Sequence, residues 1–184
     1  MKLLIRHFLK SPEFYYSVML LGLLLILSRP TIAGGQEYVP NSRLIGTAEF
    51  SIYGFRVYSA GLWAVSVPDD YQQPFALVLT YKRSISRQQL VDTSIEEIRR
   101  INGARVDDTT IKAWEAHMQN AFIAVEPGEQ IAGVFRPGVG VDFYVNGRLH
   151  YHVADIAFTR AFFDIWLSES TRDPQLRERL MGAR

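Results

Sequence analysis

The sequence predicts an α+β fold in which a large antiparallel sheet carries a layer of helices on one face. Two blocks of β-rich sequence, residues 44–81 and 130–153, are each followed by segments with the spacing of amphipathic helices. Strands that come in blocks, instead of alternating singly with helices, indicate antiparallel pairing. The dipeptide Asn146-Gly147 supports this conclusion, because it favours the two-residue hairpins that join antiparallel strands.

Three extended segments make up the first β-rich block. Residues 44–53, 55–66 and 75–81 are rich in Val, Ile, Phe, Tyr and Trp, which are enriched in strands. Gly54 and the Val-Pro-Asp-Asp sequence at 67–70 separate them, and both are typical of turns. The block therefore predicts three consecutive antiparallel strands.

The apolar spacing changes to a helical period after Ser86. Apolar residues at positions 90, 91, 95, 98 and 101 alternate with charged ones, as on an amphipathic helix. Ser86 and Gln89 form a capping-box pattern at the start, and Gly103 marks the end. A second helix is predicted from about Asp108 and is bounded by Pro127-Gly128.

The last third of the chain repeats the order of strands followed by helices. Strands are predicted at 130–136, 141–145 and 148–153, and the last two form a hairpin around Asn146-Gly147. A two-residue turn there places Val145 opposite Arg148 and Phe143 opposite His150. Helices are predicted at about 155–166 and after Asp173-Pro174, since proline is tolerated in a first helical turn.

Composition excludes several classes of function. The 184 residues include 20 Lys and Arg against 19 Asp and Glu, a formal net charge of +1. Nucleic-acid binders usually concentrate basic residues on one face, so no nucleic-acid partner is predicted. The absence of cysteine excludes disulfides, thiolate metal sites and cysteine nucleophiles. The sequence carries no Gly-rich phosphate loop, nucleophile elbow or zinc motif, and no cofactor is predicted.

The N-terminus has the pattern of a signal peptide. Lys2, Arg6 and Lys10 precede a charge-free stretch at 14–28, whose strongly apolar part covers only residues 18–27. This length suits a signal peptide better than a transmembrane helix, which needs about 20 apolar residues. Small residues follow, so cleavage is predicted after Ala33, which leaves residues 34–184 as a single periplasmic or secreted domain. The alternative is an uncleaved segment that anchors the protein to the membrane.

Two motifs carry a resemblance to a known family. The strand sequence F-x-V-Y-x-A-x-L-W spans residues 55–63, and the helical sequence A-F-F-x-I-W-L spans residues 161–167. With the Phe-Tyr-Val-Asn-Gly run at 143–147, they resemble the bacterial chalcone isomerase-like family over about residues 43–181. The resemblance implies an open-faced β-sandwich, with helices over one face of a large antiparallel sheet. Members of the family are flavonoid-cyclising isomerases, fatty-acid-binding relatives or proteins of unassigned role.

The resemblance also locates the four roles of the plant-type isomerase reaction. The catalytic arginine falls at residues 46–48, which are Gly, Thr and Ala, while Arg43 lies several residues away. The threonine falls near Ser59, the tyrosine near Leu90 and the asparagine near Glu97. Three of the four roles are unfilled, and a carboxylate would repel the phenolate that the reaction requires. Plant-type isomerase activity is therefore not expected.

A cavity between sheet and helices would be lined by apolar side chains with a few polar anchors. The candidate ligand-binding residues are Arg56, Tyr58, Ser59, Tyr81 and Arg83. The two-residue period of a strand places Arg56 and Tyr58 on one face and Ser59 on the other, so only one of these sets can face the cavity. An arginine inside would favour a ligand carboxylate, which a guanidinium binds through two parallel hydrogen bonds. The catalytic residues, if there are any, stay unassigned.

A metal site is not predicted. His150 and His152 lie two positions apart on one strand and share a face, but the hairpin register gives them Phe143 and Val141 as neighbours. A third ligand is therefore missing.

Three functions remain open from the sequence. The first is an exported binder of an apolar or amphiphilic small molecule such as a fatty acid, which contacts the membrane only through its N-terminal segment. The second is an isomerase of the intramolecular lyase type that acts on another substrate through Arg56, Tyr58 and Ser59. The third is a structural or interaction protein of the envelope with a filled core, and protein partners stay unspecified.

Overall fold

Six antiparallel strands in consecutive order form the sheet of this computed structural model, which describes residues 34–68 and 70–183. The predicted signal peptide, residues 1–33, lies outside the described residues. The strands are β1 (Arg43–Ile52), β2 (Phe55–Ala64), β3 (Phe75–Tyr81), β4 (Gln130–Arg136), β5 (Gly140–Val145) and β6 (Arg148–Val153). Each strand pairs with its neighbours in the sequence, so the order β1-β2-β3-β4-β5-β6 contains no crossover.

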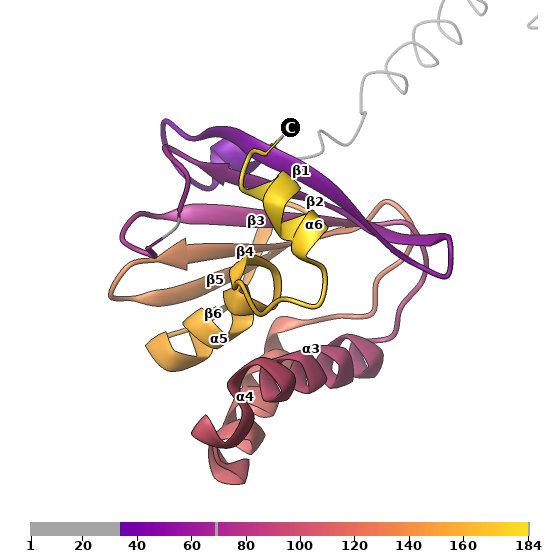
Figure 1. Cartoon of the computed structure of the whole chain (residues 1–184), viewed down its shortest axis with the longest axis vertical. Helices are drawn as coiled ribbons and strands as arrows, with labels where there is room; N and C mark the ends of the chain where they lie inside the picture. Colours follow the sequence, from indigo (N-terminus) through magenta and orange to yellow (C-terminus); the bar gives the residue numbers. More distant parts are fainter. Residues whose placement is uncertain (1–33, 69, 184) are drawn as a thin grey trace, which may run out of the picture. The chain divides into compact units, whose positions relative to one another are not determined.

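Within the described residues, four helices cover one face of the sheet (Figure 1). They are α3 (Arg87–Asn102), α4 (Asp108–Ala121), α5 (Ile156–Leu167) and α6 (Pro174–Leu180), with short 3₁₀ turns η1 (Gly35–Glu37) and η2 (Gly103–Arg105). The predicted α+β fold, an antiparallel sheet with a helical layer on one face, is confirmed.

Side-chain caps fix where the helices begin. Ser86 and Gln89 form the predicted capping box at α3, in which each side chain bonds to the backbone N–H of the other. Asp107, Asp155 and Asp173 accept a hydrogen bond from a backbone N–H in the first turns of α4, α5 and α6. Each cap satisfies an N–H group that the helix itself leaves unpaired, so the local sequence sets these boundaries.

The main core lies between the helices and the sheet, and aromatic rings fill much of it. Phe163 on α5 is fully buried and packs against Phe75, with ring centroids 4.7 Å apart. Phe162, its neighbour, packs against Phe143 at 5.1 Å. Gly133 on β4 makes room for both helix residues, because a Cβ there would lie 3.2 Å from their rings. The helix α5 is thereby seated closely on the centre of the sheet.

A second, smaller apolar cluster covers the opposite face of the sheet. Tyr38 and Val39 follow η1 and pack over Val78 and Val134. Gly35 lies directly against the Trp63 ring, where a Cβ would come within 2.2 Å of ring carbons. The sequence pattern does not predict this cover, because a three-residue turn leaves no periodic spacing of apolar residues.

Besides a register shift at Ile45 in β1, two β-bulges alter the register that simple alternation predicts. In β2, Tyr58 pairs with Phe50 while Arg56 pairs with Ser51, so Val57 is an extra residue. The second bulge lies in β6 and corrects the predicted hairpin. Val145 does pair with Arg148, but Phe143 pairs with Tyr151 and not with His150. An extra residue shifts every pair beyond it by one position and reverses the face of its side chains.

Candidate functional site

A cavity of about 580 Å³ lies between the sheet and the helices α3, α5 and α6. Strands β1 to β4 supply one wall, and the helices supply the other. Its volume falls in the range of roughly 300–1,000 Å³ that is usual for small-molecule sites. The third function considered from the sequence required a filled core, so the cavity argues against it.

The buried part of the cavity is apolar. Leu79 and Ile131 come from the sheet, and Phe122, Phe162 and Trp166 come from the helical side. All five are buried. Such a lining cannot satisfy a charged or strongly polar group, so it suits a hydrocarbon chain or a flat apolar ring system.

Two tyrosines add polar atoms to this apolar wall. Tyr58 accepts a hydrogen bond at 2.9 Å from the indole Nε1 of Trp166, and the ring centroids of Tyr58 and Tyr81 are 6.1 Å apart. Burial raises the pKa of both phenols far above the usual value. Both hydroxyls therefore stay protonated at physiological pH and can donate a hydrogen bond into the cavity.

Charged and polar residues form the rim. Arg83, Ser84 and Gln89 are exposed and line the cavity next to the start of α3. Arg83 forms no ion pair within the described residues. The rim thus carries a guanidinium that is available to an anionic group.

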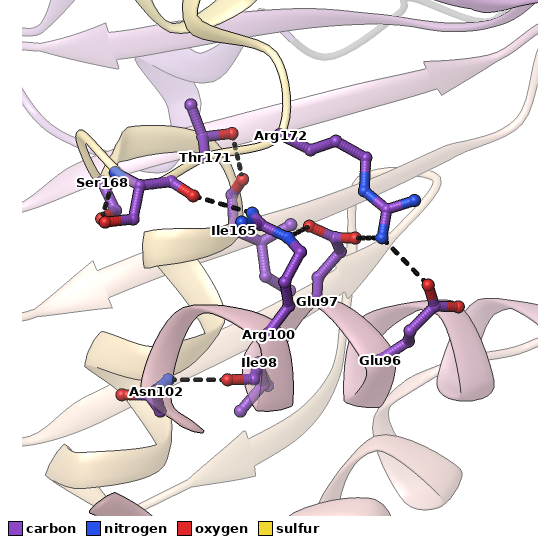
Figure 2. A network of polar contacts seen from close by, with 10 residues as sticks. Glu96, Glu97, Ile98, Arg100, Asn102, Ile165, Ser168, Thr171 and Arg172 are labelled. Carbon is purple, nitrogen blue, oxygen red and sulfur yellow. Dashed lines mark hydrogen bonds and ion pairs between the residues drawn. The ribbon is translucent and has the colours of Figure 1, made fainter. Parts of the chain in front are cut away.

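Glu97 is a buried carboxylate in the cavity wall and belongs to an ion-pair network (Figure 2). It accepts hydrogen bonds from Arg100 Nε at 3.0 Å and lies 2.5 Å from Arg172 Nη2. Arg172 also contacts Glu96 at 2.9 Å, and Arg100 donates to the carbonyl of Ser170. The network ties α3 to the loop between α5 and α6 and compensates the charge of Glu97.

The structure divides the candidate ligand-binding residues into two groups. Tyr58, Tyr81 and Arg83 line the cavity, whereas Arg56 and Ser59 do not. The expectation that Arg56 shares a face with Tyr58 is wrong, because the bulge at Val57 reverses the alternation. Arg56 lies instead on the outer face, where its Nε is 3.4 Å from a carboxylate oxygen of Glu49.

Ser59 also faces away from the helices. It pairs with Glu49 and Thr80, whereas the helix-facing positions of β2 are Tyr58, Ala60 and Leu62. A hydroxyl on the outer face cannot reach a molecule in the cavity. The interpretation of Ser59 as a substitute for the threonine of plant isomerases therefore fails on geometry.

A comparison with models of protein families agrees with the fold described above. The sequence model that describes chalcone isomerase-like proteins matches residues 42–182, which is most of the chain. The chain belongs to the chalcone isomerase-like family. No curated protein matches its sequence significantly.

A solved member of the same fold is a fatty-acid binding protein from Arabidopsis thaliana. Its structure superimposes with a TM-score of 0.60 and 14% sequence identity, and the match covers 78% of this chain and 88% of that one. At this identity the likeness establishes the shared fold.

The two helical positions that the resemblance predicted for catalytic residues do lie at the cavity in this chalcone isomerase-like chain. Leu90 and Glu97, near which the resemblance located the tyrosine and the asparagine, both line the cavity. Leu90 carries no donor, and Glu97 is held by two arginines. Residues 46–48, the expected arginine position, do not line the cavity.

The histidine pair is separated by the bulge in β6. His152 faces Asp142, and its Nδ1 lies 2.7 Å from a carboxylate oxygen, while His150 is the extra residue of the bulge. Asp142 also accepts a hydrogen bond from Arg136 at 3.0 Å. Within residues 34–68 and 70–183, no three His, Cys, Asp or Glu side chains gather where they could hold a metal ion.

Sequence reasoning missed the contribution of the loop between α5 and α6. Thr171, Arg172 and Asp173 line the cavity, although they lie about 70 residues beyond the end of α3 in the sequence. A short loop without periodicity gives no signal of its position.

The part of the chain that the structure describes contains no helix long and apolar enough to cross a membrane.

Proposed function

We propose that this protein binds an amphiphilic small molecule of the fatty-acid class in the cavity between its sheet and its helices. The observation that carries the proposal is an apolar cavity of about 580 Å³ whose rim holds Arg83, which forms no ion pair within the described residues. The hydrocarbon chain lies among Leu79, Ile131 and Phe162, and the carboxylate lies at the rim beside Arg83.

The position of the head group follows from the charges around the cavity. Arg172 also lines the rim, but Glu96 and Glu97 already neutralise it. Arg83 has no such partner within the described residues and can bind a carboxylate through two parallel hydrogen bonds. The fatty-acid binding protein with the same fold supports the choice of ligand class.

We further propose that the protein lacks plant-type chalcone isomerase activity. The reaction requires an ionised phenolate and groups that stabilise the developing enolate. Leu90 offers no hydrogen bond, Ser59 faces away, and Glu97 adds negative charge to the cavity wall. Binding without this reaction is the function that the remaining residues support.

Replacing Arg83 with glutamine is expected to weaken binding of a fluorescent fatty acid about ten-fold, because a charge-assisted hydrogen bond to the head group is lost. Fluorescence titration gives the dissociation constant. Arg87→Gln is the matched control, since Arg87 is exposed on the first turn of α3 but does not line the cavity. Equal losses in both variants would point to general electrostatic attraction and would contradict a specific site at Arg83.

Export is a separate proposal that rests on the N-terminal pattern alone. Intact-mass spectrometry of the protein from the cell envelope is expected to give a chain that begins at Gly34. A mass that includes residues 1–33 would contradict cleavage and would favour the membrane-anchored alternative.

A further inference from the structure

The turn between β1 and β2 exposes three large apolar side chains at one point of the surface. Tyr53 is 97% exposed, Phe55 67% and Ile52 47%. Figure 1 shows this hairpin (dark violet, on the right) extending past the ends of the neighbouring strands. Single exposed apolar residues are common, but three within four positions at a projecting tip mark an interaction site.

The backbone of this turn shows that tyrosine is a poor choice for the fold. Tyr53 and Gly54 have φ angles of 49° and 82°, the left-handed pair that a two-residue turn requires. The second hairpin solves the same problem with Asn146 and Gly147, at 47° and 83°. Asparagine tolerates this conformation, whereas a bulky residue does so only under strain. Since Tyr53 is almost fully exposed, its packing within the described residues does not offset the free-energy cost of that strain.

Positive charge surrounds the tip. Arg56 follows Phe55 directly, and the backbone N–H of Lys82 donates to the carbonyl of Val57 at 2.9 Å. Arg83 and Ile52 both line the cavity, and both are exposed.

Glu49 forms an ion pair with Arg56, and Asp92 is an acidic residue in the lining of the cavity. Lys82 and Arg83 have no ion-pair partner within the described residues. Glu126 lies near the start of α3 as well, where it accepts a hydrogen bond from Ser84.

We propose that the β1–β2 tip docks on the surface of an anionic lipid membrane and brings the cavity mouth to the lipid headgroups. Aromatic side chains favour the boundary between headgroups and hydrocarbon, and basic residues beside them are attracted to anionic lipids. Ile52 belongs both to the tip and to the cavity lining, so docking of the tip brings part of the lining to the membrane surface. The docking itself does not depend on which ligand the cavity holds.

The absence of cysteine allows a local test in the full chain. A single Ser51→Cys variant places an environment-sensitive fluorophore beside the tip. A Val139→Cys variant places it at the β4–β5 turn, at the opposite end of the strands. The probes are vesicles of phosphatidylcholine with phosphatidylglycerol, and vesicles of phosphatidylcholine alone, without added fatty acid.

We expect a blue shift at the Ser51→Cys label with the anionic vesicles, a weaker one with neutral vesicles, and none at the Val139→Cys label. Phe55→Ser should lower the ratio of inserted to free tip about ten-fold, because burial of its ring is lost. Tyr53→Asn should lower the same ratio while it raises the denaturation midpoint, since it relieves the strained turn. Lys82→Gln should reduce the ratio about five-fold.

Three results would overturn the proposal. The first is an unchanged tip label on chains that co-sediment with the vesicles, which would leave the N-terminal segment as the contact. The second is an equal shift at both labels. The third is a tip shift that grows with protein concentration in the absence of lipid, which would assign the tip to a second copy of the chain.

Discussion

Replacing Phe163 with alanine is expected to lower the free energy of unfolding by about 4 kcal/mol, because the change leaves a cavity at the centre of the core. Phe163 is fully buried and packs against Phe75, Phe135 and Phe162. It also fills the space above Gly133 on β4. Urea unfolding followed by circular dichroism measures the difference.

Phe55→Ala is the control for this substitution, since it removes the same side chain from an exposed position. We expect it to change the unfolding free energy by no more than about 0.5 kcal/mol. Phe163→Leu should recover most of the loss, because leucine refills much of the volume. A loss at Phe163→Ala no greater than at Phe55→Ala would show that α5 is not seated on the sheet as described.

The sequence predicted the secondary structure closely because its local signals are strong. Capping residues set the helix starts at Ser86 and Asp155, and Asn146-Gly147 sets the second hairpin turn. The change from strand to helical periodicity gave the order of the elements. These features depend on interactions between residues close in the sequence, which a single chain displays directly.

The bulges explain where the same reasoning failed. A residue added to one strand reverses the face of the sheet to which every later side chain points. It leaves the pattern of residue types in the strand almost unchanged. Alternation therefore placed Arg56 on the same face as Tyr58, and the hairpin rule placed His150 opposite Phe143. Arg56 lies next to the bulged residue Val57, and His150 is itself the extra residue of the bulge in β6. Side chains nearer the well-paired part of the sheet, such as Tyr58 and Tyr81, lie where the cavity was expected.

The rest of the site depends on contacts between distant segments. Arg172 meets Glu97 only because the loop after α5 returns across α3 (Figure 2). Periodicity and spacing in the sequence do not indicate a contact between segments so far apart. The sequence indicated a carboxylate at the asparagine position, but it did not show that two arginines compensate its charge.

Replacing Glu97 with glutamine is expected to change stability and ligand binding in opposite directions. The free energy of unfolding should fall by about 2 kcal/mol, since Arg100 and Arg172 both lose a charged partner that is itself buried. Affinity for a fatty acid should rise about five-fold, because a negative charge leaves the cavity wall and the Arg172 guanidinium becomes less neutralised. Urea unfolding and fluorescence titration measure the two effects separately.

Glu96→Gln is the matched control for this last prediction. Glu96 contacts the same Arg172, but its side chain is 68% exposed, against 10% for that of Glu97. Exposed ion pairs contribute little, so both measured quantities should stay near those of the unchanged chain. If Glu97→Gln weakened fatty-acid binding with the fold intact, Glu97 would be holding the ligand or Arg172 in place. The head group would then bind beside α3 and not beside Arg83. The opposite signs expected here thus separate a carboxylate that only secures the cavity wall from one that takes part in binding.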